Sequence, residues 1–296
     1  MNINNRKKHI VIIKGGIGNQ IFIYYFALYL KNKYPNDIVL CETRSYFWLD
    51  YKYRAKFKLK NLELKLFKNS VLGSLWMSVI IIFINIFPLN KVNKSLKKIF
   101  VVNDKNLKDL QKYYLDKNIF IYNGYFQNYR IIDKAYINNK ISINSKLFSI
   151  KYKNLENKIK NNNLSVAFCI RNFNMESSER YSYSIEKFNM LIKKILKQEK
   201  DAKFYIFAYK NININEYKFP SNAELITHEN GYSDDSAILK MIATCNIKVI
   251  SNSSTFYWIA AYISKKGICV SETNKVYISE NYRFAENLFY PSWIKY

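Results

Sequence analysis

The residues best placed to do chemistry near the start of the chain form a glycine loop, Gly15-Gly16-Ile17-Gly18-Asn19-Gln20. The loop follows a β-branched run, His9 to Lys14, which has the composition of a buried strand. Glycines after such a strand let the backbone approach a phosphate or a sugar closely, and the next helix offers free N–H groups at its positive end. The loop matches neither the dinucleotide-binding fingerprint nor the Walker loop. A tight turn that packs helix on strand is an equally open interpretation.

Two series of strands and helices are predicted to position this loop and the later polar residues. In the first, a helix over 19–33 and a strand over 38–41 open a parallel α/β sheet, and a strand over 119–122 leads into Gly124-Tyr125-Phe126-Gln127. The second series has strands at 164–170, 203–207 and 248–251 and helices at 184–197, 235–243 and 256–263. The Asn- and Lys-rich stretch 144–163 is predicted to hold the boundary between them.

The fold class predicted is therefore α/β, with two Rossmann-like domains, 1–160 and 161–296, facing a cleft. Loops at the carboxyl ends of the strands would line that cleft and hold the ligand.

Composition narrows the classes of protein that fit. The chain has 296 residues, is 49% hydrophobic and has only 7 Gly and 4 Pro, which excludes a disordered protein. Its formal charge of +25 comes from scattered Lys and Arg rather than from one basic element, which argues against a nucleic-acid partner. A solvated basic surface and attraction to anionic lipid both remain open.

The cysteines and histidines limit the chemistry further. Cys41, Cys169, Cys245 and Cys269 have no metal-site or redox spacing, so buried thiols in a reducing compartment are predicted. Two histidines leave little material for a metal site or a nucleophile–His–acid triad. No metal or cofactor is expected.

An uncharged run from Val71 to Leu89 is long enough to be a candidate membrane span. A span would put the residues before and after it on opposite sides of a membrane, which conflicts with one shared active site. Two other interpretations are a buried helix and an interfacial helix that lies among lipid headgroups with Lys68, Lys91 and Lys94 beside it. The N-terminus does not have the pattern of a signal peptide, so a cytoplasmic protein is expected, or one peripheral at the inner face of the plasma membrane.

Several segments, in order along nearly the whole chain, resemble the bacterial α-1,2-fucosyltransferases of glycosyltransferase family 11. They are the glycine loop with Ile21 and Phe22, the Gly124–Gln127 segment, the strand Phe204–Phe207, the segment Cys245–Ser254 with Trp258, and the tail Pro291-Ser292-Trp293-Ile294. The resemblance implies an inverting, metal-independent GT-B enzyme that transfers fucose from GDP-L-fucose to a galactoside hydroxyl of a surface glycan. The acceptor would be a glycan or a lipid-linked oligosaccharide. No nucleic-acid partner is expected, and peripheral contact with an anionic membrane stays open.

The chain also departs from that family pattern. Where the family has His-x-Arg-Arg-Gly-Asp, this sequence reads Cys169-Ile170-Arg171-Asn172-Phe173-Asn174, so only the first arginine matches. Arg171 is predicted to bind the donor phosphates and to act in catalysis, because a guanidinium suits a diphosphate whose negative charge grows as it leaves. A structural ion pair is the alternative. Another nucleotide-sugar donor, or a non-catalytic binder of nucleotide sugars or glycans, stays open as well.

The resemblance assigns the remaining site residues to two groups. The donor-binding residues expected are Gly16, Gly18, Asn19, Arg171, Asn252, Ser253 and Ser254, and the acceptor-side residues are Gln20, Tyr125 and Gln127. The segment 252–254 could equally cap a helix. No general base is assigned, because the available carboxylates of the second half, Glu176, Glu179, Asp234 and Asp235, are more typical of surface acids.

Overall fold

The computed structural model describes residues 6–43, 59, 62, 68, 70–136, 140–170, 185–210, 212–250, 254–264, 267–271, 288 and 290–295. The chain forms two compact units, Met1–Ser142 and Ile143–Tyr296. The units divide after residue 142, whereas the sequence predicts a boundary after residue 160. Helix α6 (Ile150–Asn161) therefore belongs to the second unit.

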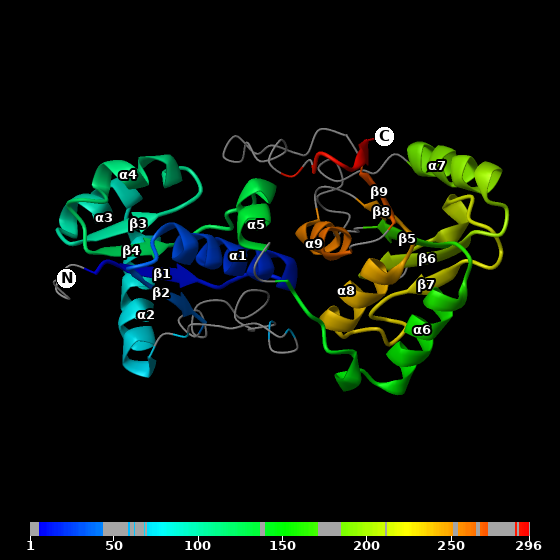
Figure 1. The fold of residues 1–296 in the computed structure, drawn as a ribbon, viewed down its shortest axis with the longest axis horizontal. Helices are drawn as coiled ribbons and strands as arrows, with labels where there is room; N and C mark the ends of the chain where they lie inside the picture. The colour runs from blue at the N-terminus through cyan, green and yellow to red at the C-terminus, as the bar shows by residue number, and fades with distance from the viewer. Residues whose placement is uncertain are drawn as a thin grey trace. The chain divides into compact units, whose positions relative to one another are not determined.

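The first unit is built on a parallel four-stranded sheet in the order β2-β1-β4-β3 (Figure 1). Its strands are β1 (Lys8–Ile12), β2 (Ile38–Glu42), β3 (Ile99–Val102) and β4 (Ile119–Tyr122). The chain moves outward from β1 to β2 and later arrives at β4 from β3 on the other side. The connections thus diverge between the neighbouring strands β1 and β4, and the carboxyl edge of such a switch point is where α/β sheets bind ligands.

Helix α1 (Ile17–Lys33) packs on one face of this sheet, where the Phe26 and Tyr122 rings lie 5.2 Å apart. It is buried on most sides because α5 (Tyr129–Tyr136) covers it from outside, with the Tyr25 and Tyr136 rings 5.6 Å apart. The other face carries α2 (Val71–Ile86) and α3 (Leu89–Ser95), which pack on Ile10, Ile12, Val101 and Ile121. Short helices η3 (Leu107–Asp109) and α4 (Leu110–Tyr113) connect β3 to β4.

The second unit is built on a parallel six-stranded sheet in the order β10-β9-β8-β5-β6-β7 (Figure 1). Its strands are β5 (Ser165–Ile170), β6 (Lys203–Ala208), β7 (Glu224–Ile226), β8 (Ile247–Ile250), β9 (Ile268–Ser271) and β10 (Ile294–Lys295). Counted in chain order from β7 across to β10, the strands run 3-2-1-4-5-6, which is the Rossmann arrangement with its switch point between β5 and β8.

Helices cover both faces of the second sheet. Helix α7 (Ile185–Gln198) buries Phe188 and Ile192 against the face that carries Phe168 and Phe204. Helices α8 (Asp235–Thr244) and α9 (Thr255–Ile263), with α6, lie on the opposite face. The short helices η4 (Ser145–Leu147) and η6 (Ile214–Glu216) complete the described elements.

Most predicted elements are confirmed within one or two residues, and all four cysteines are buried and unpaired as predicted. Helix α1 begins at Ile17 with Gly16 as its N-cap, two residues before the predicted start at Asn19. The helix in the apolar run is buried on one side only. Among the described residues, no helix combines the length and the apolar character that crossing a membrane requires.

Candidate functional site

The glycine loop lies at the carboxyl edge of β1, next to the switch point of the first sheet, and its turn depends on Gly15. Gly15 has a φ of 81°, and a Cβ there would lie 3.1 Å from both Asn19 Cβ and Tyr125 Cε1. The buried Gln20 side chain closes the turn, with Nε2 donating to the Gly15 carbonyl at 2.8 Å. The backbone therefore turns sharply here, and it comes close to the loop after β4.

The loop after β4 is held by a carboxylate from the loop after β3. Asp104 Oδ2 accepts a hydrogen bond from the Tyr125 amide at 2.9 Å, and Oδ1 accepts one from the Phe126 amide at 2.7 Å. A Cβ at Gly124 would lie only 2.6 Å from Asp104 Oδ2, so this approach requires glycine. Phe126 takes a left-handed φ of 49°, and its ring stacks on Phe26 of α1 at 3.9 Å. Carboxylate and ring together hold a conformation that non-glycine residues seldom adopt.

Two side-chain contacts join the loops after β1 and β4 into one cluster. Gln127 Nε2 donates to Asn19 Oδ1 at 2.9 Å, and Lys14 Nζ donates to Asn123 Oδ1. Lys14 Nζ also lies 5.2 Å from the centre of the half-buried Tyr125 ring. We call Lys14, Asn19, Asn123, Tyr125 and Gln127 the amide cluster. Amides donate and accept hydrogen bonds, as sugar hydroxyls do. The amide cluster therefore suits a neutral polyhydroxylated ligand, and Lys14 provides one positive charge beside it.

Asp104 is the acid beside this cluster. Burial raises the pKa of its carboxyl above the ordinary value, and the two amide hydrogen bonds and the charge of Lys14 offset only part of that effect. Both oxygens already accept from backbone amides. The arrangement therefore assigns Asp104 to positioning the loop rather than to proton transfer.

In the second unit, the strands that flank the switch point end at Ile170 and Ile250, immediately before the predicted donor segments in the sequence. Arg171, Asn252 and Ser253 lie outside the described residues. Ser254 is described: it is buried and caps α9, accepting from the Tyr257 amide at 3.4 Å. The capping interpretation of Ser254 is thus confirmed, and its role toward a donor stays a prediction.

The hydroxyl of Tyr257 ties the ends of two strands to this helix. It lies 3.1 Å from the Ile170 carbonyl and 3.1 Å from the Phe207 carbonyl, at the ends of β5 and β6. A hydroxyl has one proton, so it donates to these two carbonyls in a shared or alternating way. The contact fixes the start of α9 against the edge where Arg171 follows β5.

Of the four carboxylates considered in the second half, two are described. Asp234 caps α8 by accepting from the Ser236 and Ala237 amides, which occupies one of its oxygens. Asp235 Oδ1 lies 3.8 Å from His228 Nε2. Glu176 and Glu179 lie outside the described residues.

The structure shows how the predicted residues of the first unit contact one another, and their roles toward donor and acceptor stay predictions. Asn19 and Gln127, predicted on the donor and acceptor sides, bond to each other. Gln20 is buried and holds the turn, whereas Gly16 has open space around it and Gly18 is buried within α1. Sequence reasoning missed Lys14, Asp104 and Asn123, although each directly follows a strand or lies two residues beyond one.

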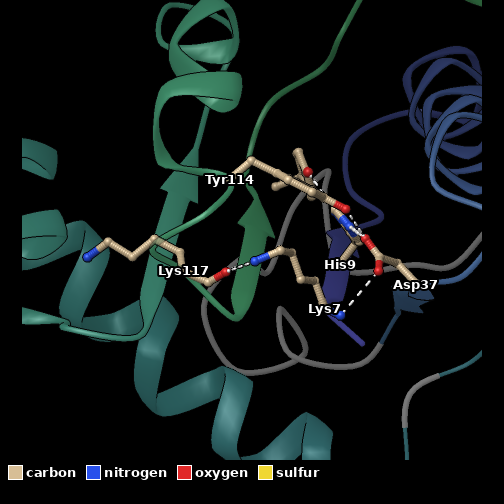
Figure 2. A network of polar contacts seen from close by, with 6 residues as sticks. Lys7, His9, Asp37, Tyr114 and Lys117 are labelled. Carbon is tan, nitrogen blue, oxygen red and sulfur yellow. Dashed lines mark hydrogen bonds and ion pairs between the residues drawn. The ribbon is translucent and has the colours of Figure 1, made fainter. Parts of the chain in front are cut away.

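A separate polar network lies at the amino edge of the first sheet, away from the amide cluster (Figure 2). His9 Nε2 lies 3.0 Å from Asp37 Oδ2, and His9 Nδ1 lies 2.8 Å from the hydroxyl of the buried Tyr122. Tyr114 also donates to Asp37, and the Lys7 amide donates to its other oxygen at 3.2 Å. A carboxylate only accepts, so the contacts assign the proton to Nε2 and make Tyr122 the donor to Nδ1.

The pKa values in this network follow from those partners. Burial lowers the pKa of His9 below 6.5, and the contact with Asp37 offsets only part of the effect. Burial acts to raise the pKa of Asp37, but the hydrogen bonds from Tyr114, His9 and Lys7 outweigh it and lower that pKa. Every group in the network is thus satisfied by the protein itself, and the network stabilises the fold rather than a ligand.

Within the described ranges, no group of three or more His, Cys, Asp or Glu is placed to hold a metal ion. That no metal is required stays a prediction.

Neither a protein-family model nor a curated protein sequence matches the chain. Its fold, however, matches solved structures. A variant of Arabidopsis thaliana FUT1 in complex with GDP aligns with 88% of this chain and 69% of its own, at 11% identity and a TM-score of 0.52. Fucosyltransferase NodZ from Bradyrhizobium aligns with 87% of this chain and 92% of its own, at 12% identity and a TM-score of 0.55. NodZ α-1,6-fucosyltransferase soaked with GDP-fucose gives a TM-score of 0.53 over the same shares, at 12% identity. The chain therefore has the GT-B fold of these fucosyltransferases, built from two Rossmann-like units, as the sequence predicts.

Proposed function

We propose that the chain is an inverting glycosyltransferase that transfers fucose from GDP-L-fucose to a galactoside hydroxyl, with α-1,2 linkage, on a surface glycan. The observation that carries the proposal is the amide cluster at the switch point of a unit whose fold is that of fucosyltransferases. The sequence resemblance described above supports the finer donor and linkage. We place the reaction in the cytoplasm, in keeping with four buried, unpaired cysteines.

The first unit supplies the acceptor side in this proposal. Asn19, Asn123 and Gln127 offer amide groups for sugar hydroxyls. The Gln127–Asn19 hydrogen bond and the one from Lys14 to Asn123 can be exchanged for bonds to those hydroxyls. Tyr125 adds an aromatic surface whose position is fixed by Asp104 through its backbone amide. The sharp turns at Gly15 and Phe126 bring these groups together.

The second unit supplies the donor side. The acceptor hydroxyl oxygen forms a bond to the anomeric carbon while the bond from that carbon to the diphosphate breaks, and the electron pair leaves with GDP. The hydroxyl proton passes to water, since no residue is assigned as the base. Arg171 neutralises the negative charge that grows on the diphosphate, so no metal is required. Ser254 and the N-terminus of α9 contribute N–H and hydroxyl groups at the same edge of the sheet.

The direct test is turnover of GDP-fucose by the purified chain in the presence of EDTA, with other nucleotide sugars tested in parallel. Transfer or hydrolysis of GDP-fucose alone supports the proposal. Signal only from another nucleotide sugar refutes the donor and keeps the reaction class. Tight GDP binding with no turnover of any donor refutes catalysis and favours the non-catalytic alternative.

Arg171→Ala should lower kcat by about two orders of magnitude or more, because one charge-stabilising group in a transition state is worth that much. Arg130→Ala is the matched control. Arg130 is an exposed arginine on α5, and its side chain contacts its neighbour Tyr129. Near-normal turnover of Arg171→Ala would remove that residue from the site.

A further inference from the structure

Helix α2 leaves one whole side of its surface uncovered, and that side is apolar. Its sheet-facing side buries Met77, Ile80, Ile81 and Ile84 against the first sheet. The opposite side exposes large apolar side chains at a helical spacing: Val71, Leu72, Leu75, Trp76, Val79, Ile82 and Ile86, followed by Phe87. We call these eight residues the apolar face. Leu72 is 79% exposed, and Val79 and Ile86 are each 65% exposed.

A helix that is apolar all round is ordinarily enclosed by protein or lipid, because water on one side would select polar residues there. The exposed side chains of α2 also form a continuous stripe rather than isolated surface residues, and contiguous apolar patches of that kind mark interaction sites. The polar residues Ser74 and Ser78 do not interrupt the stripe, since their hydroxyls bond to Glu42 and to the Ser74 carbonyl. The apolar face therefore needs a partner.

The charges beside the apolar face indicate the chemistry of that partner. Between Glu63 and Asp104 the sequence contains no acidic residue. In this segment Lys68, Lys91, Lys94, Lys97 and Lys98 are all exposed. In the part of the chain that the structure describes, no carboxylate pairs with Lys91, Lys94, Lys97 or Lys98. An apolar strip that is followed in the chain by exposed lysines without a carboxylate partner among the described residues is complementary to a bilayer that carries negative headgroups.

We propose that the apolar face docks the protein on an anionic lipid surface. Helix α2 has 16 residues and is about 24 Å long, and in this arrangement it lies along the membrane rather than across it. The aliphatic side chains enter the acyl boundary, Trp76 sits at headgroup depth, and the α3 lysines contact the phosphates. The buried side of α2 stays on the sheet, where the Ser74 hydroxyl bonds to Glu42 Oε2 at 2.8 Å.

The start of α2 is connected to the edge of the sheet that carries the glycine loop. The Glu42 carboxylate bonds Ser74 in the first turn of α2, and the Glu42 carbonyl accepts from the Ile13 amide at 2.8 Å, two residues before Gly15. The start of the helix that carries the apolar face is therefore linked to the strand end before the glycine loop. Docking itself does not depend on the proposed sugar transfer, so either idea can fail alone.

Co-sedimentation of the purified full chain with vesicles tests the proposal. Strong binding is expected to vesicles of equal parts phosphatidylcholine and phosphatidylglycerol, and weak binding to phosphatidylcholine alone. Added salt should weaken binding to the vesicles that contain phosphatidylglycerol. The double variant Leu72→Glu/Val79→Glu should lower partitioning by roughly tenfold for each side chain withdrawn. Both positions are exposed, so the fold should persist. The matched control Leu115→Glu, at a site 87% exposed in the same unit, should bind as the unaltered chain does.

Two further variants separate insertion from simple charge attraction. Lys91→Gln/Lys94→Gln should weaken binding to the anionic vesicles by about fivefold for each lysine. Tryptophan fluorescence should shift to shorter wavelength on binding, and Trp76→Phe should abolish that shift while leaving sedimentation nearly unchanged.

The proposal is overturned if the unaltered chain does not sediment with anionic vesicles, or if Leu72→Glu/Val79→Glu sediments equally well. A fluorescence shift that survives in Trp76→Phe would place the contact elsewhere on the protein. If the unaltered chain is instead a dimer in solution that the double variant dissociates, and vesicles do not compete, the occupant of the apolar face is a second copy of the chain.

Discussion

Replacing Asp104 by Asn should damage the proposed acceptor side while leaving donor chemistry intact. Its two oxygens accept from the Tyr125 and Phe126 amides at 2.9 and 2.7 Å. An asparagine keeps one acceptor and turns the other atom into a donor that faces an N–H group. A hydrogen bond to a charged group stabilises the fold by about 1.5–3 kcal/mol. The asparagine avoids the cost of burying a charged carboxylate, which offsets part of the lost stability. We therefore expect the loop to lose about 1–2 kcal/mol of stability.

That loss should appear mainly in transfer. Displacement of Tyr125 and Gln127 weakens acceptor binding, so kcat/KM for transfer should fall by about tenfold, the factor that 1.4 kcal/mol gives. Hydrolysis of the donor without acceptor should stay close to normal, because the second unit is unchanged. The thermal midpoint should fall by only a few degrees, roughly 2–4 °C per kcal/mol for a chain unit of this size.

The measurements are paired assays of donor hydrolysis and of transfer, together with thermal unfolding. Asp116→Asn is the matched control, since Asp116 is an exposed acid in the same unit. Equal loss of hydrolysis and transfer in Asp104→Asn would show that the acid acts in chemistry rather than through the loop. Unchanged transfer would refute the argument that the loop of Tyr125 belongs to the site.

Two predictions concern stability. Gly15→Ala should lower the free energy of unfolding by about 1–2 kcal/mol or more, because Gly15 has a φ of 81° and a Cβ there meets neighbours at 3.1 Å or closer. Gly16→Ala should change the thermal midpoint little, because a Cβ there has open space. Similar thermal midpoints for the two variants would contradict this prediction. The pKa of His9 in the folded chain is below its ordinary value of 6.5, so below pH 6.5 the unfolded chain binds more protons than the folded chain does. The free energy of unfolding should therefore fall as the pH drops from about 6.5, with a limiting slope of about 1.4 kcal/mol per pH unit. Denaturant unfolding at a series of pH values below 6.5 should show this fall in stability in the unaltered chain and in His228→Gln, but not in His9→Gln. If His9→Gln shows the same fall, other groups cause it.

Local patterns predicted much of the fold because most strands here are short β-branched runs ended by turn residues. Strand β4 is predicted at its observed bounds for that reason. Strand β3 was missed, since its four apolar residues stand inside a stretch that otherwise looks helical. Helix α6 was also missed, because its Asn and Lys resemble a linker. Its buried residues Tyr152, Leu155, Glu156 and Ile159 nevertheless follow a helical period, so a signal was present.

The site could be predicted only as separate loops. The Asn19–Gln127 contact joins residues 108 positions apart, and the Asp104 bonds depend on β3 lying beside β4. Spacing along the chain carries no information on that strand order. For Gln20 the structure adds a contact that its motif position does not predict, because its side chain closes the Gly15 turn. Its role on the acceptor side stays a prediction.

The structure also changes where specificity should be sought in this chain. The sequence departs from the family pattern after β5, around Arg171, and that segment leaves another donor or a non-catalytic binder open. The first unit shows no comparable loss, because Asp104, Gly15 and the Asn19–Gln127 pair hold the amide cluster through contacts that need no ligand. The same unit exposes the apolar face, and Glu42 links the start of that helix to the strand end before the glycine loop. In these two proposals acceptor recognition and membrane docking both rest on the first unit, so a lipid-borne acceptor would meet both within that unit.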